Sequence, residues 1–312
     1  MANLWGGNLV SVPPRLLLNG KKSGLESVRD AIAKCREDAQ LDVRVTYEGG
    51  DIARFVEEAV AQGVTRIIAG GGDGTVNETT AALMALDKDQ RPEMGVFPLG
   101  TANDFATSAG IDEDLTKALQ LAMSGDVFWV DVAKANEHFF INVASGGFGA
   151  QVTSTTPVAL KNFLGGGAYT LSGLIQAVNF TPFPGTIEVD GEEEEVNVIV
   201  AAACNGRQAG GGQQLAPHAF INDGLIDVVA ISEFPPESVS DVFKELVEIQ
   251  DKPEMDGKFV RRMQTKGVKW CAKETMPVNL DGEPINEKNI EFRVLAGEIP
   301  MVLPSNCPLL KS

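Results

Sequence analysis

The sequence of 312 residues lacks the features that mark several common protein classes. It has only four cysteines and two histidines, and the cysteines lie far apart without a CxxC pair or Cys/His ligand spacing. This argues against a zinc site and against a disulfide framework. There is no run of about 18 apolar residues and no basic segment followed by an apolar one at the start. We therefore expect a cytoplasmic protein with neither a secretion signal nor a membrane-spanning helix.

Positive charge is also scarce. The chain has 26 Lys and Arg residues against 43 Asp and Glu residues, a formal net charge of −17. A protein that coats nucleic acid or adheres strongly to anionic lipid needs a basic face, so both classes are disfavoured. The content of 44% hydrophobic and 22% charged residues is that of an ordinary globular protein. A chain of this length is expected to form about two domains.

Short apolar runs alternate with helical periodicity in the N-terminal part of the chain. Residues 16–18, 43–45 and 66–69 are predicted strands, and residues 27–35 and the segment after Asp51 are predicted helices. Strands separated by single helices require parallel crossovers, so we expect an open α/β structure with a parallel sheet. Ligands of such sheets bind at the carboxyl ends of the strands.

The second half of the chain has longer β-rich stretches and predicts antiparallel structure. Asp190 and Gly191 lie between two alternating runs and predict a hairpin turn, and the acidic run of residues 192–195 beside them is expected to be a solvated edge. Two triple glycines, at residues 165–167 and 210–212, are compatible with a phosphate-binding loop, a hinge or a plain turn.

A glycine-rich segment carries the first functional signal. The predicted strand 66–69 runs into Gly-Gly-Gly-Asp-Gly-Thr at residues 70–75, and a helical pattern follows. Glycines let backbone N–H groups approach phosphate oxygens, and a helix N-terminus favours the anion. Thr75 and Asn77 can add side-chain hydrogen bonds. The P-loop and GxGxxG patterns are both absent, and taken alone the segment fits a structural tight turn almost as well.

A second strand runs into another Gly-Thr turn, in the sequence VFPLGTANDFA. Parallel strands place such turns at the same edge of a sheet, so Thr101, Asn103 and Asp104 are expected to complete the site that begins at Asp73. The alternative is that Asn103 and Asp104 only cap a helix.

Together, GGDGT-x-NE and PLGTANDFA resemble the catalytic-domain superfamily of diacylglycerol kinases, and the chain is most similar to the YegS-like bacterial lipid kinases. GGDGT alone is shared with NAD kinases and is similar to a loop of phosphofructokinases, whereas the second motif points to lipid and sphingoid kinases. Further blocks, NVASGGFG, NGRQAGGG, NDGLIDV and LDGEP, follow in family order. The resemblance therefore covers nearly the whole chain.

The resemblance implies a fold of two domains. The first is a Rossmann-like α/β nucleotide-binding domain with a parallel sheet, of the NAD kinase and diacylglycerol kinase type, comprising residues 1–135 and about 297–312. The second is a C-terminal antiparallel β-sandwich, the lipid and metal domain, at residues 136–296.

The resemblance also implies the residues that bind ATP. Carried over by position, they are Thr46, Gly72, Asp73, Gly74, Thr75, Val76, Asn77, Glu78 and Thr101. Asp73 is expected to act catalytically, near the transferring phosphate or its magnesium. One departure concerns the first loop, where many relatives have Asn-Pro and this chain has Asn19 and Gly20, which leaves the role of that loop open.

Two carboxylates compete for the role of catalytic base. Glu283 in LDGE matches the proton acceptor of the family, and Asp281 is an alternative assignment that the sequence leaves open. Phosphoryl transfer requires positioned N–H donors, a divalent cation and an oriented nucleophile. A carboxylate can take the proton of a lipid hydroxyl, and a like charge nearby would raise its pKa. The alternative for Asp281 and Gly282 is a plain hairpin turn.

A structural metal ion is a further implication of the resemblance. The Asp223 carboxylate and the backbone carbonyls of Phe220 and Leu225 would hold Mg²⁺ or Ca²⁺, and the choice depends on ligand number and flexibility. A metal-free Asn-Asp-Gly turn is the alternative.

The sequence thus predicts an ATP- and magnesium-dependent lipid kinase. It would transfer the γ-phosphate to a hydroxyl of a membrane glycerolipid, such as diacylglycerol or phosphatidylglycerol, with transient contact at the membrane surface and no nucleic-acid partner. An apolar slot for the acceptor is expected between the domains, with residues 163–171 contributing. The alternatives are a kinase for a soluble acceptor such as NAD, and a nucleotide and lipid sensor without turnover.

Overall fold

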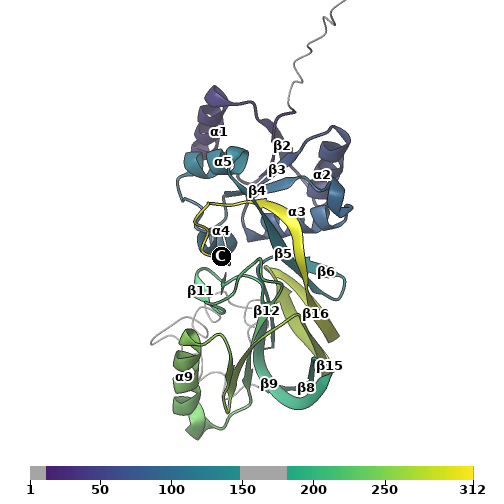
Figure 1. Ribbon diagram of the computed structural model, residues 1–312, viewed down its shortest axis with the longest axis vertical. Helices are drawn as coiled ribbons and strands as arrows, with labels where there is room; N and C mark the ends of the chain where they lie inside the picture. The colour runs from purple at the N-terminus through teal and green to yellow at the C-terminus, as the bar shows by residue number, and fades with distance from the viewer. Residues whose placement is uncertain (1–11, 148–180, 312) are drawn as a thin grey trace, which may run out of the picture.

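The computed structural model describes residues 12–147 and 181–311. Figure 1 shows an N-terminal lobe of helices around a short sheet and, below it, a C-terminal lobe made mainly of long strands. We call the elements from β1 to α5, with the chain end that packs on them, the N-terminal lobe. The elements from β6 to β15 form the C-terminal lobe, and strands β5 and β16 run between the two. The segment expected to line the acceptor slot, residues 163–171, lies outside the described residues, and so does the triple glycine within it, residues 165–167.

The N-terminal lobe contains a parallel sheet in the order β4-β3-β1-β2. Its strands are β1 (Arg15–Asn19), β2 (Asp42–Thr46), β3 (Arg66–Gly71) and β4 (Glu93–Pro98). Its helices are α1 (Glu26–Asp38), α2 (Asp51–Ala61), α3 (Asp73–Met84), the 3-10 turn η1 (Lys88–Gln90), α4 (Asp104–Ser108) and α5 (Leu115–Ser124). The central strands β1 and β3 have apolar interiors, residues 16–18 and 67–69, because helices cover both faces. The predicted α/β series with a parallel sheet is confirmed.

The C-terminal lobe is built from antiparallel strands. Its elements, with the strands that run between the lobes, are β5 (Val127–Ala135), β6 (His138–Phe140), β7 (Val143–Gly147), β8 (Phe183–Val189), β9 (Glu192–Cys204), β10 (Gln208–Ala209), β11 (Gln213–Gln214), β12 (Ile226–Ser232), η2 (Pro236–Ser238), α9 (Val239–Glu248), η3 (Ile249–Asp251), β13 (Met255–Asp256), β14 (Val260–Thr265), β15 (Gly267–Leu280) and β16 (Glu283–Val302). Strand β8 leads into β9 through the two-residue turn of Asp190 and Gly191, whose φ angles are 52° and 85°. The predicted hairpin is confirmed, because a turn with positive φ at both positions matches the twist of the strands.

The 20-residue strand β16 ties the lobes together. Its first part pairs with β15, its second part pairs antiparallel with β5, and Met301 pairs with Met94 of β4. The chain after β16 then packs on the N-terminal lobe, where Leu303, Cys307 and Leu309 belong to the same buried cluster as β1 and β3. The chain end is therefore part of the N-terminal core, although it follows the C-terminal lobe in sequence.

A separate apolar cluster fills the C-terminal lobe. Strands of its two layers contribute side chains such as Val198, Val228, Trp270 and Val278, which are at most 6% exposed. Residues 267–272 of β15 alternate between buried and more exposed positions, as in sheets that pack face to face, whereas β7 is buried throughout. Within the described residues, no helix is both long enough and apolar enough to cross a membrane.

A buried arginine holds the helical segment of the C-terminal lobe against its sheet. Arg262 of β14 is 2% exposed and donates hydrogen bonds to the carbonyls of Ile249 at 2.7 Å, Lys252 at 3.0 Å and Leu215 at 2.6 Å. Burial lowers its pKa, while the nearby carboxylate of Asp227 raises it. Loss of the guanidinium would leave those carbonyls without their donor and remove the positive charge near the carboxylate of Asp227.

We predict that Arg262→Met destabilises the protein far more than Arg261→Met. Arg261, on the same strand, is 35% exposed and pairs with the exposed side chains of Glu194 and Asp256. The expected losses in free energy of unfolding are about 3 kcal/mol for the buried arginine and under about 1 kcal/mol for the exposed one. Urea denaturation of both variants measures them, and equal losses would contradict the role given to Arg262.

Candidate active site

The glycine-rich turn after β3 depends on close backbone approach. A Cβ on Gly71 would lie 2.1 Å from the Thr75 Oγ1, and one on Gly72 would lie 3.0 Å from the Gly100 Cα. Gly74, by contrast, faces open space. Helix α3 starts at Asp73 without a side-chain cap. The Thr75 and Val76 N–H groups donate to the Gly72 carbonyl, which leaves the N–H groups before them for an anion.

The two glycine turns meet, as their neighbouring parallel strands require. The Leu99 N–H donates to the Gly71 carbonyl at 2.7 Å, and the Phe105 N–H donates to Asp73 Oδ1 at 3.1 Å. Burial raises the pKa of Asp73, and the negative charge of Asp104 adds to the effect. Asp73 is therefore held at the junction of both turns.

The two polar residues of the second turn have different roles. Asn103 closes the turn, because its Oδ1 accepts the Gly100 N–H at 2.7 Å, while the Asp104 carboxylate accepts the N–H groups of Gly211 at 2.9 Å and Gly212 at 2.6 Å. Asn103 is the N-cap residue of α4, but its side chain makes no capping hydrogen bond. Thr101 is exposed at the turn.

The second triple glycine forms an anion-binding turn. Residues 210–212 have φ angles of 66°, 89° and 94°, a left-handed conformation that favours glycine. Successive N–H groups in such a turn converge on an anion, and here the anion is the carboxylate of Asp104. This contact joins α4 of the N-terminal lobe to the loop between β10 and β11.

A cleft of about 350 Å³ lies where these segments converge. Asp73 and Asp104 line it from the N-terminal lobe, and Asn142, Gly210 and Asp281 line it from the C-terminal lobe. Its size is within the range of small-molecule sites. The two lobes therefore share one acidic cleft beside the glycine turn.

Asp281 occupies the tight turn between β15 and β16. Its carboxylate accepts three backbone N–H groups, those of Ile141 at 2.8 Å, Asn142 at 3.1 Å and Val143 at 2.7 Å. Burial raises its pKa to about 6 although these hydrogen bonds act in the opposite direction. With φ of 48° at Asp281 and 100° at Gly282, the two residues form the hairpin turn that was the alternative to a catalytic role, and the Asp281 carboxylate also holds the start of β7.

Glu283 is the first residue of β16 and is exposed. It lies near Glu78 of α3, because the pKa of Glu78 is raised first by burial and next by the charge of Glu283. The two negative charges are therefore close enough to repel each other, although they belong to different lobes. No such pairing could be inferred from their positions in the sequence.

The first loop lies against the glycine turn. The Gly20 N–H donates to Thr46 Oγ1 at 3.3 Å, and Asn19 Nδ2 donates to Thr75 Oγ1 at 3.4 Å. A Cβ on Gly20 would lie 2.2 Å from the Thr46 carbonyl oxygen, so this position requires glycine. The loop that departs from the Asn-Pro pattern therefore borders the predicted ATP-binding residues.

Two asparagines of the site were not assigned from sequence. Asn142 is 4% exposed, lines the cleft and donates through Nδ2 to the Gln208 carbonyl at 2.7 Å. Asn205 is fully buried and donates to the carbonyls of Ile141 at 2.7 Å and Asp131 at 3.2 Å. The sequence feature that could have identified them is an asparagine next to a run of apolar strand residues. A polar side chain at such a position is buried and must find hydrogen-bond partners.

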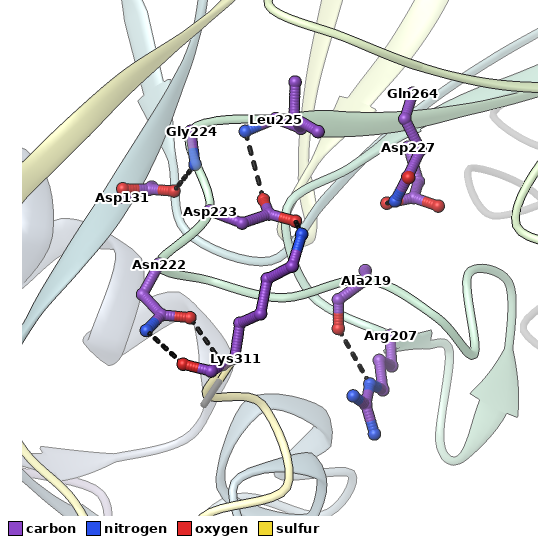
Figure 2. Close-up of polar contacts among 10 residues, drawn as sticks. All are labelled: Asp131, Arg207, Ala219, Asn222, Asp223, Gly224, Leu225, Asp227, Gln264 and Lys311. Carbon is purple, nitrogen blue, oxygen red and sulfur yellow. Dashed lines mark hydrogen bonds and ion pairs between the residues drawn. The ribbon is translucent and has the colours of Figure 1, made fainter.

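The predicted metal loop contains a buried carboxylate, shown in Figure 2. The Asp223 side chain is 4% exposed, Oδ1 accepts the Leu225 N–H at 3.1 Å, and Oδ2 lies 3.3 Å from Lys311 Nζ. Carboxylate and carbonyl oxygens suit Mg²⁺ or Ca²⁺, and the ammonium shows that the position accepts positive charge. Among the described residues, no group of three acidic, histidine or cysteine side chains surrounds a common point. A divalent ion would therefore rely on backbone carbonyls and water beside Asp223.

Comparison with known families covers almost the entire chain. Residues 14–135 match the diacylglycerol kinase catalytic domain, and residues 142–303 match the YegS C-terminal NAD kinase beta sandwich-like domain. The α/β N-terminal domain and the β-sandwich that follows it correspond to these two family domains.

Curated relatives match over the same length. The chain is 46% identical to a protein of Shewanella frigidimarina named "Probable lipid kinase YegS-like", covering 95% of both chains. It is 42% identical to the "Probable lipid kinase YegS" of Salmonella newport, covering 95% of this chain and 97% of the relative. A solved structure from Bacillus anthracis, named as a candidate diacylglycerol kinase, superposes with a TM-score of 0.72 at 26% identity, covering 94% and 98% of the two chains. The chain therefore belongs to the YegS-like lipid kinase family.

Proposed function

We propose that this chain transfers the γ-phosphate of ATP to a hydroxyl group of a membrane glycerolipid, such as diacylglycerol or phosphatidylglycerol. Membership in a lipid kinase family makes it a phosphotransferase with an alcohol acceptor. The observation that carries the proposal is the shared cleft, where the uncapped start of α3 meets carboxylates of both lobes. Such a site offers donors for phosphate oxygens and a base for the acceptor.

The glycine turn is the proposed site of the ATP phosphates. The start of α3 presents backbone N–H groups, and Gly74 leaves open space above them. The residues proposed to bind ATP are Thr46, Gly72, Asp73, Gly74, Thr75, Val76, Asn77, Glu78 and Thr101. The Asn77 side chain is 6% exposed, and its Oδ1 has no hydrogen-bond partner among the described residues. Such an unsatisfied atom can accept a hydrogen bond from water or a ligand.

Asp73 is the proposed carboxylate beside the transferring phosphate. Magnesium bound with ATP would neutralise charge that develops on the phosphoryl oxygens. Burial raises the pKa of Asp73, and a cation beside it would favour its ionised form. The hydrogen bond from the Phe105 N–H orients this carboxylate before substrate arrives.

Glu283 is the proposed base that takes the proton of the lipid hydroxyl. The Asp281 carboxylate is held by three backbone N–H groups, which reduces its freedom to accept a proton from substrate. Glu283 is exposed, and its charge acts on Glu78 of α3. We therefore assign Asp281 a positioning role and Glu283 the proton transfer.

The proposal extends to the two domains, the metal ion and the location of the protein. We propose a nucleotide domain of residues 1–135 and 297–312, and a lipid and metal domain of residues 136–296. We also propose that Asp223 and the carbonyls of Phe220 and Leu225 hold a divalent cation, and that the enzyme is cytoplasmic and contacts the membrane surface transiently.

The function is tested by transfer of labelled γ-phosphate from ATP and Mg²⁺ to a panel of mixed-micelle lipids, with NAD and sphingoid bases included. We expect labelled glycerolipid, and we expect Asp73→Asn to lower the rate at least about 100-fold. Asp241→Asn, at an exposed carboxylate of α9, is the control and should retain activity. Label on NAD alone would move the chain to the soluble-acceptor class, and ATP binding without product would identify a sensor.

The two candidate bases are separated by steady-state kinetics. Glu283→Gln should lower kcat by about 100-fold or more with little change in the KM for ATP, because it removes proton transfer but no nucleotide contact. Asp281→Asn should cause a smaller loss, since an amide oxygen can still accept part of the backbone hydrogen bonding. The reverse order would assign the base to Asp281.

The buried carboxyl of Asp281 should also make stability depend on pH. Its folded pKa of about 6 lies above the ordinary value of 3.8, so the native state binds the proton more tightly and this contribution falls as pH rises through 6. The difference in free energy of unfolding between wild type and Asp281→Asn should be about 1 kcal/mol larger at pH 5 than at pH 8. Urea denaturation at both values measures it, and a difference independent of pH would refute the raised pKa.

A further inference from the structure

The end of the chain is hydrogen-bonded to the loop that contains Asp223. The Ile221 N–H donates to the Leu309 carbonyl at 3.0 Å. The Asn222 side chain then bonds both backbone groups of Lys311, since its Nδ2 donates to the carbonyl at 3.2 Å and its Oδ1 accepts the N–H at 2.7 Å. Figure 2 shows this pair of bonds below Asp223. The backbone of Lys311 is therefore fixed beside the loop, and its side chain starts from a defined position.

The Lys311 side chain reaches from this position to the buried carboxylate. Its Nζ lies 3.3 Å from Asp223 Oδ2 and 5.8 Å from the centre of the Phe220 ring. The lysine side chain is 55% exposed while the Asp223 side chain is only 4% exposed. A carboxylate at such depth requires a compensating charge, and the exposed ammonium can supply it from the solvent side.

The surroundings of Asp223 explain why a cation is needed there. The neighbouring carboxylate of Asp131 is 2% exposed and accepts the N–H groups of Gly224 and Gly297, both at 2.7 Å. Arg207 lies nearby, but it donates to the Ala219 carbonyl at 2.8 Å (Figure 2). Within the described residues, the ion pair of Asp223 is the one with Lys311.

We propose that the Lys311 ammonium and a divalent cation compete for the Asp223 carboxylate. The ammonium pairs with one oxygen of the carboxylate that a metal ion would also need, and two cations at one carboxylate repel each other. Lysine is suited to such exchange because its flexible stem lets the ammonium leave for solvent. The protein thus carries its own cation for this loop, and a divalent ion binds only when that cation moves away.

The exchange would act on the junction of the lobes. Leu309, two residues before Lys311, is fully buried in the core of the N-terminal lobe, whereas the Asp223 loop leads into β12 of the C-terminal lobe. Displacing the ammonium removes one link between these segments and leaves the backbone bonds of Asn222. Divalent ion concentration would therefore modulate how tightly the chain end holds the two lobes together.

The test compares the full chain with Lys311→Met, in the absence of nucleotide so that metal bound with ATP does not interfere. The control is Lys244→Met, because Lys244 is an exposed lysine paired with an exposed carboxylate on α9. In EDTA, Lys311→Met should lower the Tm by about 2 °C or more, and the control should not. In calorimetric titration with Ca²⁺ alone, Lys311→Met should bind about five- to tenfold more tightly than wild type.

Two further variants locate the effect. Lys311→Arg keeps the charge and should bind Ca²⁺ with an affinity close to that of wild type, while Asp223→Asn should abolish the Ca²⁺ binding that Lys311→Met enhances. Equal Ca²⁺ affinity in wild type and Lys311→Met, or no Ca²⁺ binding in either, would overturn the proposal. Because the readouts are metal affinity and stability, they are independent of whether the chain phosphorylates a lipid.

Discussion

The contact between two glycine turns determines the geometry of the candidate site. The backbones of Gly72 and Gly100 approach so closely that a Cβ on Gly100 would lie 2.6 Å from the Gly72 Cα. This contact exists because β3 and β4 are adjacent parallel strands that end at the same edge. It places the start of α3 beside that of α4, and with it the carboxylates of Asp73 and Asp104. A side chain at either glycine would separate the turns and disperse the acidic groups.

Carboxylates bound by backbone N–H groups then join the lobes around that contact. Asp104 accepts N–H groups of Gly211 and Gly212, and Asp281 accepts those of the segment before β7. Such charge-assisted bonds are stronger than neutral ones and fix the direction of the acceptor. The acidic side chains that line the cleft, Asp73, Asp104 and Asp281, are therefore all held by backbone N–H groups, whereas Glu283 is exposed at the start of β16.

The chain end also connects the two lobes. After crossing between the lobes in β16, it returns to the N-terminal core through Leu303 and Leu309 and presents Lys311 to the Asp223 loop. In a chain with a net charge of −17, buried carboxylates need either backbone donors or a specific cation. Asp131 and Asp281 use backbone donors, whereas Asp223 combines one backbone donor, the Leu225 N–H, with the ammonium of Lys311. This distribution explains how an acidic protein accommodates several buried acids near one junction.

The sequence by itself determined the features that depend on neighbouring residues. The parallel strand series, the glycine turns and the hairpin at Asp190 follow from apolar periodicity and from the backbone freedom of glycine, which act over a few positions. Only the tertiary structure decided the contacts between residues that lie 107 positions apart for Asp104 and Gly211, 140 for Asp281 and Ile141, and 88 for Lys311 and Asp223. Local sterics carry no information about such pairs, because the path of the whole chain brings them together.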